Sequence, residues 1–88
     1  MLAMNNINLD LKSLGASFKH ERLAVGLTQA EVAHKAGLRR ETIIQLESGA
    51  SISANTLIQA TSALGKTLVI VDRRLDYDRL DEVFHDDH

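Results

Sequence analysis

The chain has 88 residues, which is enough for one small domain and too few for two. Apolar residues make up 44% and charged residues 25% of it, as in ordinary globular proteins, and this argues against a wholly disordered chain. Cysteine is absent, so neither disulfides nor a thiolate metal site can support the core. Proline is absent too, and only 3% of the residues are aromatic, which favours helices over a sandwich or barrel.

The net charge of −2 conceals two regions of opposite sign. Residues 1–66 carry seven cations and five anions, whereas residues 67–88 carry three cations and seven anions. The first region can therefore bind a polyanion although the whole chain is weakly acidic. No apolar run approaches the roughly 18 residues that span a bilayer, and the first residues do not resemble a signal peptide. We therefore expect a cytoplasmic protein with no membrane partner.

The first predicted helix follows an N-terminal arm, residues 1–8. One face of this helix is marked by residues at helical spacing: Leu11, Leu14, Phe18, Arg22 and Val25. Arg22 is the only charged member of that face. Asn8 or Asp10 can cap the start of the helix, and Gly26 can end it in a left-handed conformation.

Thr28 is predicted to cap a second helix, over residues 29–36. Glu31 stands three positions later and completes a capping box, and Gly37 ends the helix. The pattern therefore predicts a short helix with a well-defined start and a sharp turn behind it.

A third helix is expected from about residue 40 to 48, with Gly49 at its end, and a fourth begins at the potential cap Ser53 and closes at Gly65. On the third helix Ile43 and Leu46 are expected to face inward. The fourth has residues at helical spacing at Ala54, Leu57, Ile58, Thr61 and Leu64.

The segment after the fourth helix, residues 67–74, has the composition of a β-strand. Its apolar positions are Leu68, Val69, Ile70 and Val71. A lone strand cannot satisfy its own backbone N–H and C=O groups, so we expect it to pair antiparallel with a second copy about a two-fold axis. The alternative is a fifth helix that closes the core. Residues 75–88 form an acidic C-terminal tail, as either a short amphipathic helix or a mobile extension.

Residues 29–46 have the pattern of two helices that cross steeply through a short turn. Apolar positions on both helices lock the pair: Val32, Ala36, Leu38, Ile43 and Leu46. Ala33 is small enough to let the next helix approach closely, and Gly37 supplies the positive φ of the turn.

Three blocks of sequence resemble the Xre/Cro-like repressor family. They are GLTQAEVAHKAGL at 26–38, ETIIQLESG at 41–49 and SISANTLIQATSALGK at 51–66. The resemblance implies a mainly α, lambda-repressor-like helix-turn-helix domain over residues 9–66, with four to five helices and one C-terminal β-strand that pairs across a dimer. It also implies double-stranded DNA as the ligand.

The resemblance implies two sets of DNA contacts. Base contacts in the major groove fall on Arg40, Glu41, Ile44 and Gln45, and phosphate contacts fall on Thr28, Gln29, Arg39, Ser48 and Ser51. Arg, Gln and Glu can pair with guanine, adenine and cytosine respectively, and an apolar side chain can touch a thymine methyl. Two residues depart from the family pattern. Arg39 replaces a usual Ser or Thr cap, and Glu41 places an acid against a polyanion, which leaves its base contact open.

The resemblance further implies that Arg22 and Glu47 form a buried ion pair that orients the reading helix. The text LGKTLVIVD at 64–72 is similar to that of HipB-type antitoxins, which join two chains through a small sheet. That similarity implies a homodimer on a palindromic operator, autoregulation, and a HipA-like kinase toxin as a possible partner.

The open alternatives are a stand-alone phage-type repressor and a helix-turn-helix module that binds protein and does not read DNA. No phosphate-binding glycine loop and no Ser/His/Asp or Cys/His set is present in the sequence, so we expect no enzymatic activity, no cofactor and no metal site.

Overall fold

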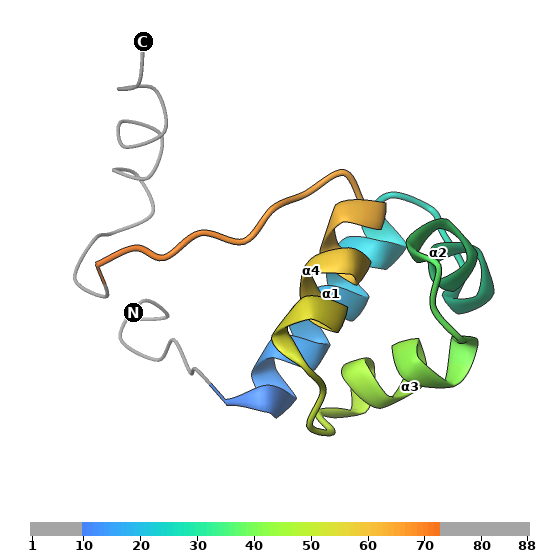
Figure 1. Cartoon of the computed structure of the whole chain (residues 1–88). Coiled ribbons are helices and arrows are strands. Elements are labelled where there is room, and N and C mark those ends of the chain that lie inside the picture. The colour runs from blue at the N-terminus through green and yellow to red at the C-terminus, as the bar shows by residue number, and fades with distance from the viewer. Residues whose placement is uncertain (1–9, 73–88) are drawn as a thin grey trace, which may run out of the picture.

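A computed structural model describes residues 10–72, and these residues form four α-helices (Figure 1). The helices are α1 (Leu11–Ala24), α2 (Gln29–Ala36), α3 (Arg40–Ser48) and α4 (Ala54–Ala63). The mainly α fold is confirmed for this part of the chain. The N-terminal arm and the acidic tail lie outside the described residues. None of the four helices is long and apolar enough to cross a membrane.

Three helices begin where a short polar side chain accepts a backbone hydrogen bond. The Asp10 carboxylate accepts from the Ser13 N–H at 2.8 Å, so Asp10 caps α1. The Thr28 hydroxyl accepts from the Glu31 N–H at 3.0 Å while the Glu31 carboxylate accepts from the Thr28 N–H at 2.8 Å, which confirms the predicted capping box. Ser53 caps α4 in the same way. These local bonds satisfy N–H groups that a helix start leaves without partners.

The four glycines that were predicted to end helices all have positive φ angles: Gly26, Gly37, Gly49 and Gly65. At Gly37 the φ of 71° produces the sharp turn between α2 and α3. The N-terminus of α3 is less well capped than those of the other helices, because Arg39 occupies the cap position and its side chain makes no capping hydrogen bond. The missing bond follows from the replacement of the usual Ser or Thr by Arg39.

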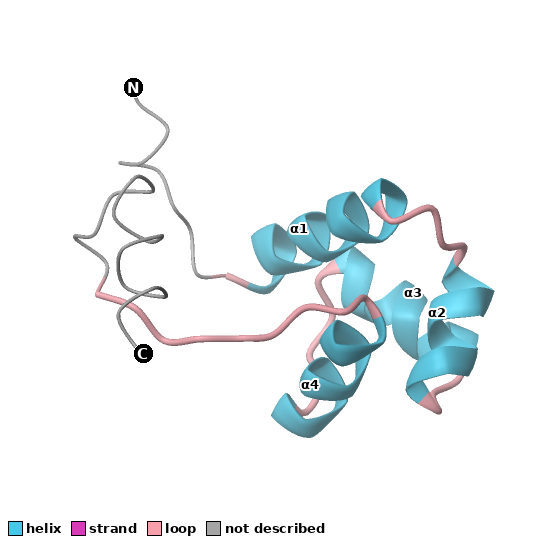
Figure 2. Ribbon diagram, turned by 90° about the horizontal axis from the view of Figure 1, so that it is seen from above, coloured by secondary structure: helices cyan, strands magenta, loops and turns pink. Residues whose placement is uncertain are grey.

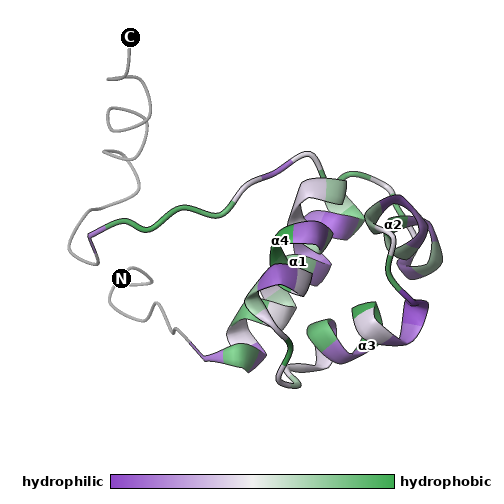
Figure 3. Cartoon of the chain, viewed as in Figure 1, coloured by the Kyte–Doolittle hydropathy of each residue, from purple (hydrophilic) through white to green (hydrophobic). Residues whose placement is uncertain are grey.

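The core is built from apolar side chains of all four helices. Each helix carries hydrophobic residues, drawn in green on the ribbon in Figure 3. Its buried members are Phe18, Val32, Ala33, Ile43, Leu46, Ala60 and Leu64. The apolar stripe predicted on α1 is only partly inward, because Leu11 and Val25 at its two ends are each 42% exposed. Only the central part of that stripe reaches the core.

Helix α1 packs closely against the C-terminal half of α3. A Cβ atom placed on Gly15 would collide with the backbone carbonyl oxygen of Leu46 and would lie 2.9 Å from that of Glu47. Helix α2 packs against both α3 and α4, and the turn between α2 and α3 lies at one side of the molecule (Figures 1 and 2). These contacts fix the position of α3 from two sides.

The strand predicted after α4 is not formed within one chain. Residues 67–72 form neither a strand nor a fifth helix; they leave the helical body as an extended coil (Figure 2). A strand requires a neighbouring strand to bond its backbone, and no other described segment of this chain offers one. The side chains of Leu68, Val69, Ile70 and Val71 are consequently exposed.

Candidate nucleic-acid interface

The α2–α3 pair is a rigid unit held by buried contacts on both helices. Val32 and Ile43 are completely buried, and Ala33 is almost completely so. The turn is closed by the Leu38 N–H, which donates to the Ala33 carbonyl at 2.9 Å. Because the small Ala33 side chain lies at this contact, the two helices can approach closely. The outer face of α3 is therefore held in a fixed direction.

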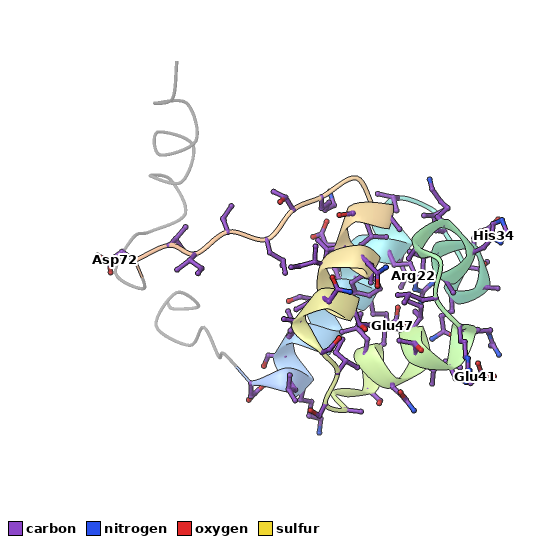
Figure 4. The ribbon with its side chains drawn as sticks, viewed as in Figure 1. Arg22, His34, Glu41, Glu47 and Asp72 are labelled. Atoms are coloured by element: carbon purple, nitrogen blue, oxygen red, sulfur yellow. The ribbon has the colours of Figure 1, made fainter. Side chains whose placement is uncertain are left out.

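That outer face carries the four residues predicted to contact bases. Arg40, Glu41, Ile44 and Gln45 are all exposed, whereas Ile43 and Leu46 point into the core. The four positions follow the helical spacing i, i+1, i+4 and i+5, which places them on one side of α3. The Glu41 side chain points away from the helical body (Figure 4). Ile44 remains 38% exposed although it is a large apolar residue.

The chemistry of this face suits the edges of base pairs. A guanidinium group donates two parallel hydrogen bonds, an amide both donates and accepts, a carboxylate accepts, and an aliphatic side chain packs on a methyl group. All four kinds of group are present on α3, at Arg40, Gln45, Glu41 and Ile44. A surface with donors, acceptors and an apolar contact on one helix can discriminate between base pairs in the major groove.

The residues predicted to contact phosphate differ in how free their side chains are. The Thr28 hydroxyl is engaged in the α2 cap, and the Ser48 hydroxyl donates to the Gln45 carbonyl at 2.9 Å. Arg39 and Ser51 are exposed. Gln29 is half-buried and its amide group donates to Glu47 at 3.1 Å. Arg39 is the only charged residue among these five, and it is exposed.

The ion pair predicted between Arg22 and Glu47 is present beneath this surface (Figure 4). Arg22 Nε lies 2.6 Å from Glu47 Oε2, and Arg22 Nη2 lies 3.1 Å from Glu47 Oε1. Arg22 Nη1 also donates to the Leu27 carbonyl at 2.8 Å. The two side chains are only 7% and 5% exposed. The hydrogen bonds with Glu47 raise the pKa of Arg22 above its ordinary value, so the guanidinium stays charged.

Two features of the site have no signal in the local sequence. The first is the hydrogen bond from Gln29 to Glu47, which joins the start of α2 to the end of α3. The second is the position of Lys12 beside the loop that follows α3: a Cβ placed on Gly49 would lie 2.9 Å from Lys12 Cα. Lys12 is exposed and so adds a cation next to this loop. Both pairs are far apart in the chain, so only the fold brings them together.

The described part of the chain offers no site for a metal ion. Residues 10–72 contain no group of three or more His, Cys, Asp or Glu side chains that could hold one. The histidines in this part of the chain, His20 and His34, are both exposed.

The fold and the exposed face of α3 define a helix-turn-helix domain, in which the second helix of the unit is the one that enters the major groove. The helix-turn-helix family HTH_3 matches residues 18–71, and the chain belongs to this family. The fold is also similar to the crystal structure of the clp gene regulator ClgR from C. glutamicum, with a TM-score of 0.64 and 27% sequence identity over 69% of this chain and 80% of that one. The protein is a DNA-binding transcription regulator of the helix-turn-helix class.

Proposed function

We propose that this regulator is a sequence-specific repressor that binds a palindromic operator as a homodimer. The observation that carries the proposal is the outer face of α3, where a guanidinium, a carboxylate, an amide and an aliphatic group are exposed on one side of a firmly held helix. The similar structure belongs to a protein described as a gene regulator, which supports a role in transcription.

In this proposal each subunit places α3 in one major groove. Arg40, Glu41, Ile44 and Gln45 contact bases, and a two-fold axis sets the half-sites one helical turn apart, about 34 Å. The phosphates are bound by Thr28, Gln29, Arg39 and Ser51, and by Ser48 once its hydroxyl leaves the Gln45 carbonyl. The backbone N–H groups at the start of α2 support this role, because a helix N-terminus attracts anions.

The test is a fluorescence-anisotropy titration of the protein onto the DNA upstream of its own gene and onto a scrambled duplex, at two salt concentrations. A specific repressor prefers its operator by about 1000-fold or more, and its affinity falls steeply as salt rises. Weak and equal binding to both duplexes, repeated across tiled upstream fragments, would contradict the proposal.

The proposed homodimer pairs the exposed segment Leu68–Val71 with the same segment of a second copy. The exposure of four consecutive apolar side chains supports this pairing, as does an extended backbone that forms no strand with any other segment of residues 10–72. Val69→Asp and Ile70→Asp are therefore expected to yield monomers in sedimentation experiments. A dimer that survives both substitutions would exclude a shared strand.

We further propose that the regulator is the antitoxin of a HipA-like kinase toxin and itself catalyses no reaction. The support is the strand-like sequence directly after α4, which is similar to that of HipB-type antitoxins. If a neighbouring gene encodes such a kinase, its expression alone should arrest growth and co-expression of this protein should relieve the arrest. Without such a gene, the stand-alone repressor is the better interpretation.

A protein-binding helix-turn-helix module is the second candidate. It is favoured by Ile44 and Glu41 on the outer face of α3, since an exposed aliphatic group and an acid suit a protein surface as well as DNA. Arg40→Ala and Gln45→Ala separate the two functions. A DNA reader loses operator affinity in both variants, whereas a protein-binding module shows no change in DNA affinity.

A further inference from the structure

A shallow groove between α1 and α4 lies next to the exposed C-terminal segment. Its volume is about 170 Å³, and its walls are mainly apolar. It is lined by Leu14 and Phe18 of α1, by Leu57 of α4 and by Leu64 directly after α4. Leu68 of the exposed segment also lines the groove. The groove and the exposed apolar segment are therefore one continuous surface.

The exposed segment continues this surface into solvent. Ile70 is fully exposed, and Leu68, Val69 and Val71 are each exposed over two-fifths or more of their area. In an extended segment alternate side chains share a face, so Leu68 and Ile70 point to one side and Val69 and Val71 to the other. The side with Leu68 is the side of the groove, because Leu68 lines it.

Two-fold symmetry restricts how two copies of this segment can pair. In an antiparallel ladder, hydrogen-bonded and non-hydrogen-bonded residue pairs alternate. A two-fold axis must place hydrogen-bonded pairs on hydrogen-bonded pairs and non-hydrogen-bonded pairs on non-hydrogen-bonded pairs. It therefore passes midway between a residue and the same residue of the other copy, which lie directly opposite each other. The centre of the pairing is therefore a residue, and the candidates are Leu68, Val69 and Ile70.

Only one of these centres keeps charged residues out of its five central positions. Pairing centred on Leu68 places Ile70 opposite Lys66, and pairing centred on Ile70 places Leu68 opposite Asp72. Pairing centred on Val69 places Leu68 opposite Ile70 of the other copy and leaves no charged residue among the paired positions 67–71. The centre at Val69 is thus the register that buries the most apolar surface.

We propose that a second copy of this chain seats its Ile70 in the groove between α1 and α4, in a ladder centred on Val69. Directly opposite residues share a face of the sheet, so the Ile70 side chain of the other copy lies beside Leu68 at the groove. The groove is large enough for this side chain. A cavity of roughly 150 Å³ holds a benzene molecule, and an isoleucine side chain is smaller than benzene. By symmetry each copy fills the groove of the other. The inference rests on the proposed homodimer and specifies its interface.

Disulfide trapping tests the register, because the chain contains no native cysteine. Opposite residues in an antiparallel pair have Cα atoms about 4.5–5.5 Å apart, which suits a disulfide, whereas positions two residues out of register are too distant. Val69→Cys should form a covalent dimer on mild oxidation. Leu68→Cys and Ile70→Cys should each fail alone and cross-link when the two variants are mixed. Lys19→Cys, exposed on α1, is the control for random collisions.

Stronger self-linking of Leu68→Cys or Ile70→Cys than of Val69→Cys would overturn the register. A dimer by sedimentation with no cross-link at any of the three positions would place the interface elsewhere and would also overturn the inference. DNA binding is measured separately by anisotropy with each unoxidised variant. Retained operator binding then shows that the proposed repressor function stands even where the interface is wrong.

Side-chain truncation tests the groove itself. Ile70→Ala should weaken dimerisation about tenfold or more, because it empties both grooves, while Val71→Ala on the opposite face should weaken it less than threefold. Equal effects of the two variants would show that the groove does not receive Ile70.

Discussion

The ion pair beneath the reading helix gives the most demanding test of the fold, through Glu47→Ala. This substitution removes all three hydrogen bonds that join Glu47 to Arg22 and Gln29, and leaves Arg22 with its bond to the Leu27 carbonyl. The guanidinium keeps its proton in this variant, because an arginine side chain is not deprotonated in proteins. An uncompensated charge is then left in a buried position. The expected cost is about 3–5 kcal/mol.

This cost is a large part of the total stability. A chain of this size has a free energy of unfolding of roughly 4–13 kcal/mol. With an m-value of about 1.5 kcal/mol/M, the urea midpoint should fall by about 2–3 M in Glu47→Ala, at an unchanged m-value. Urea unfolding followed by far-ultraviolet circular dichroism measures both quantities.

Two further variants show whether the buried charge is the cause. Glu47→Gln keeps the shape and a neutral acceptor, and should cost less than Glu47→Ala. The double substitution Arg22→Met with Glu47→Leu removes both charges and should recover most of the loss, since well-packed apolar residues replace buried ion pairs at little cost. A loss below about 1 kcal/mol in Glu47→Ala would refute the reasoning, because it is the value of an exposed pair.

Four other predictions follow from the described residues. Arg40→Ala should weaken operator binding by about 1–3 kcal/mol and relax specificity at one base pair, as measured by anisotropy on single-substituted operators. Lys12→Ala should weaken binding equally on operator and scrambled duplexes. It should also reduce the slope of log affinity against log salt concentration by about 1. Gly15→Ala should lower the free energy of unfolding by about 1–3 kcal/mol in urea, because its Cβ would collide with the backbone of α3. Hydrogen bonds from the Thr28 N–H and hydroxyl lower the pKa of Glu31 below its ordinary value of 4.5. The contribution of the ionised Glu31 carboxylate to the free energy of unfolding is therefore complete above pH 4.5, and it is lost as the pH falls through the pKa of the folded state. Glu31→Gln should therefore remove part of the acid limb of the stability curve.

Each of these predictions has a control or a contradicting result. Equal losses on every duplex would make Arg40 a phosphate contact. Lys66→Ala is the control for Lys12, because Lys66 pairs with Glu21 at 3.4 Å, and an equal effect of both would indicate a general charge effect. Ala16→Gly, exposed on the same helix as Gly15, should cost only the helix propensity of about 1 kcal/mol. An unchanged acid limb in Glu31→Gln would show that its cap does not stabilise the folded state.

The sequence was sufficient for features that are decided within a few residues. The capping box at Thr28 and Glu31 and the helix end at Gly37 depend on neighbours three or four positions away, and both are present as predicted. The ion pair between Arg22 and Glu47 is also present, but it was inferred from the family resemblance, because 25 residues separate the partners.

The sequence was insufficient where distant segments meet or where a partner is required. The residues around Gly15 in the sequence do not show that the backbone of α3 packs where a side chain at this position would lie. Likewise, the residues around Lys12 do not show that it lies beside the loop at Gly49. The segment 67–71 has the composition of a strand, yet composition alone does not provide a neighbouring strand, and the single chain leaves it as coil.

Helix α3 has an exposed reading face and a C-terminal half that is anchored on α1, in addition to the buried contact of Ile43. Gly15 and Arg22 of α1 hold its C-terminal end, at Leu46 and Glu47, through backbone contact and the buried ion pair. The residues proposed to contact bases all lie before that end, at positions 40–45. A substitution in the anchored half therefore tilts the whole helix and should weaken every duplex alike, whereas a substitution on the reading face changes one contact and so changes the preferred sequence. Glu47→Gln and Gln45→Ala, two residues apart, should separate these effects in a single set of operator variants.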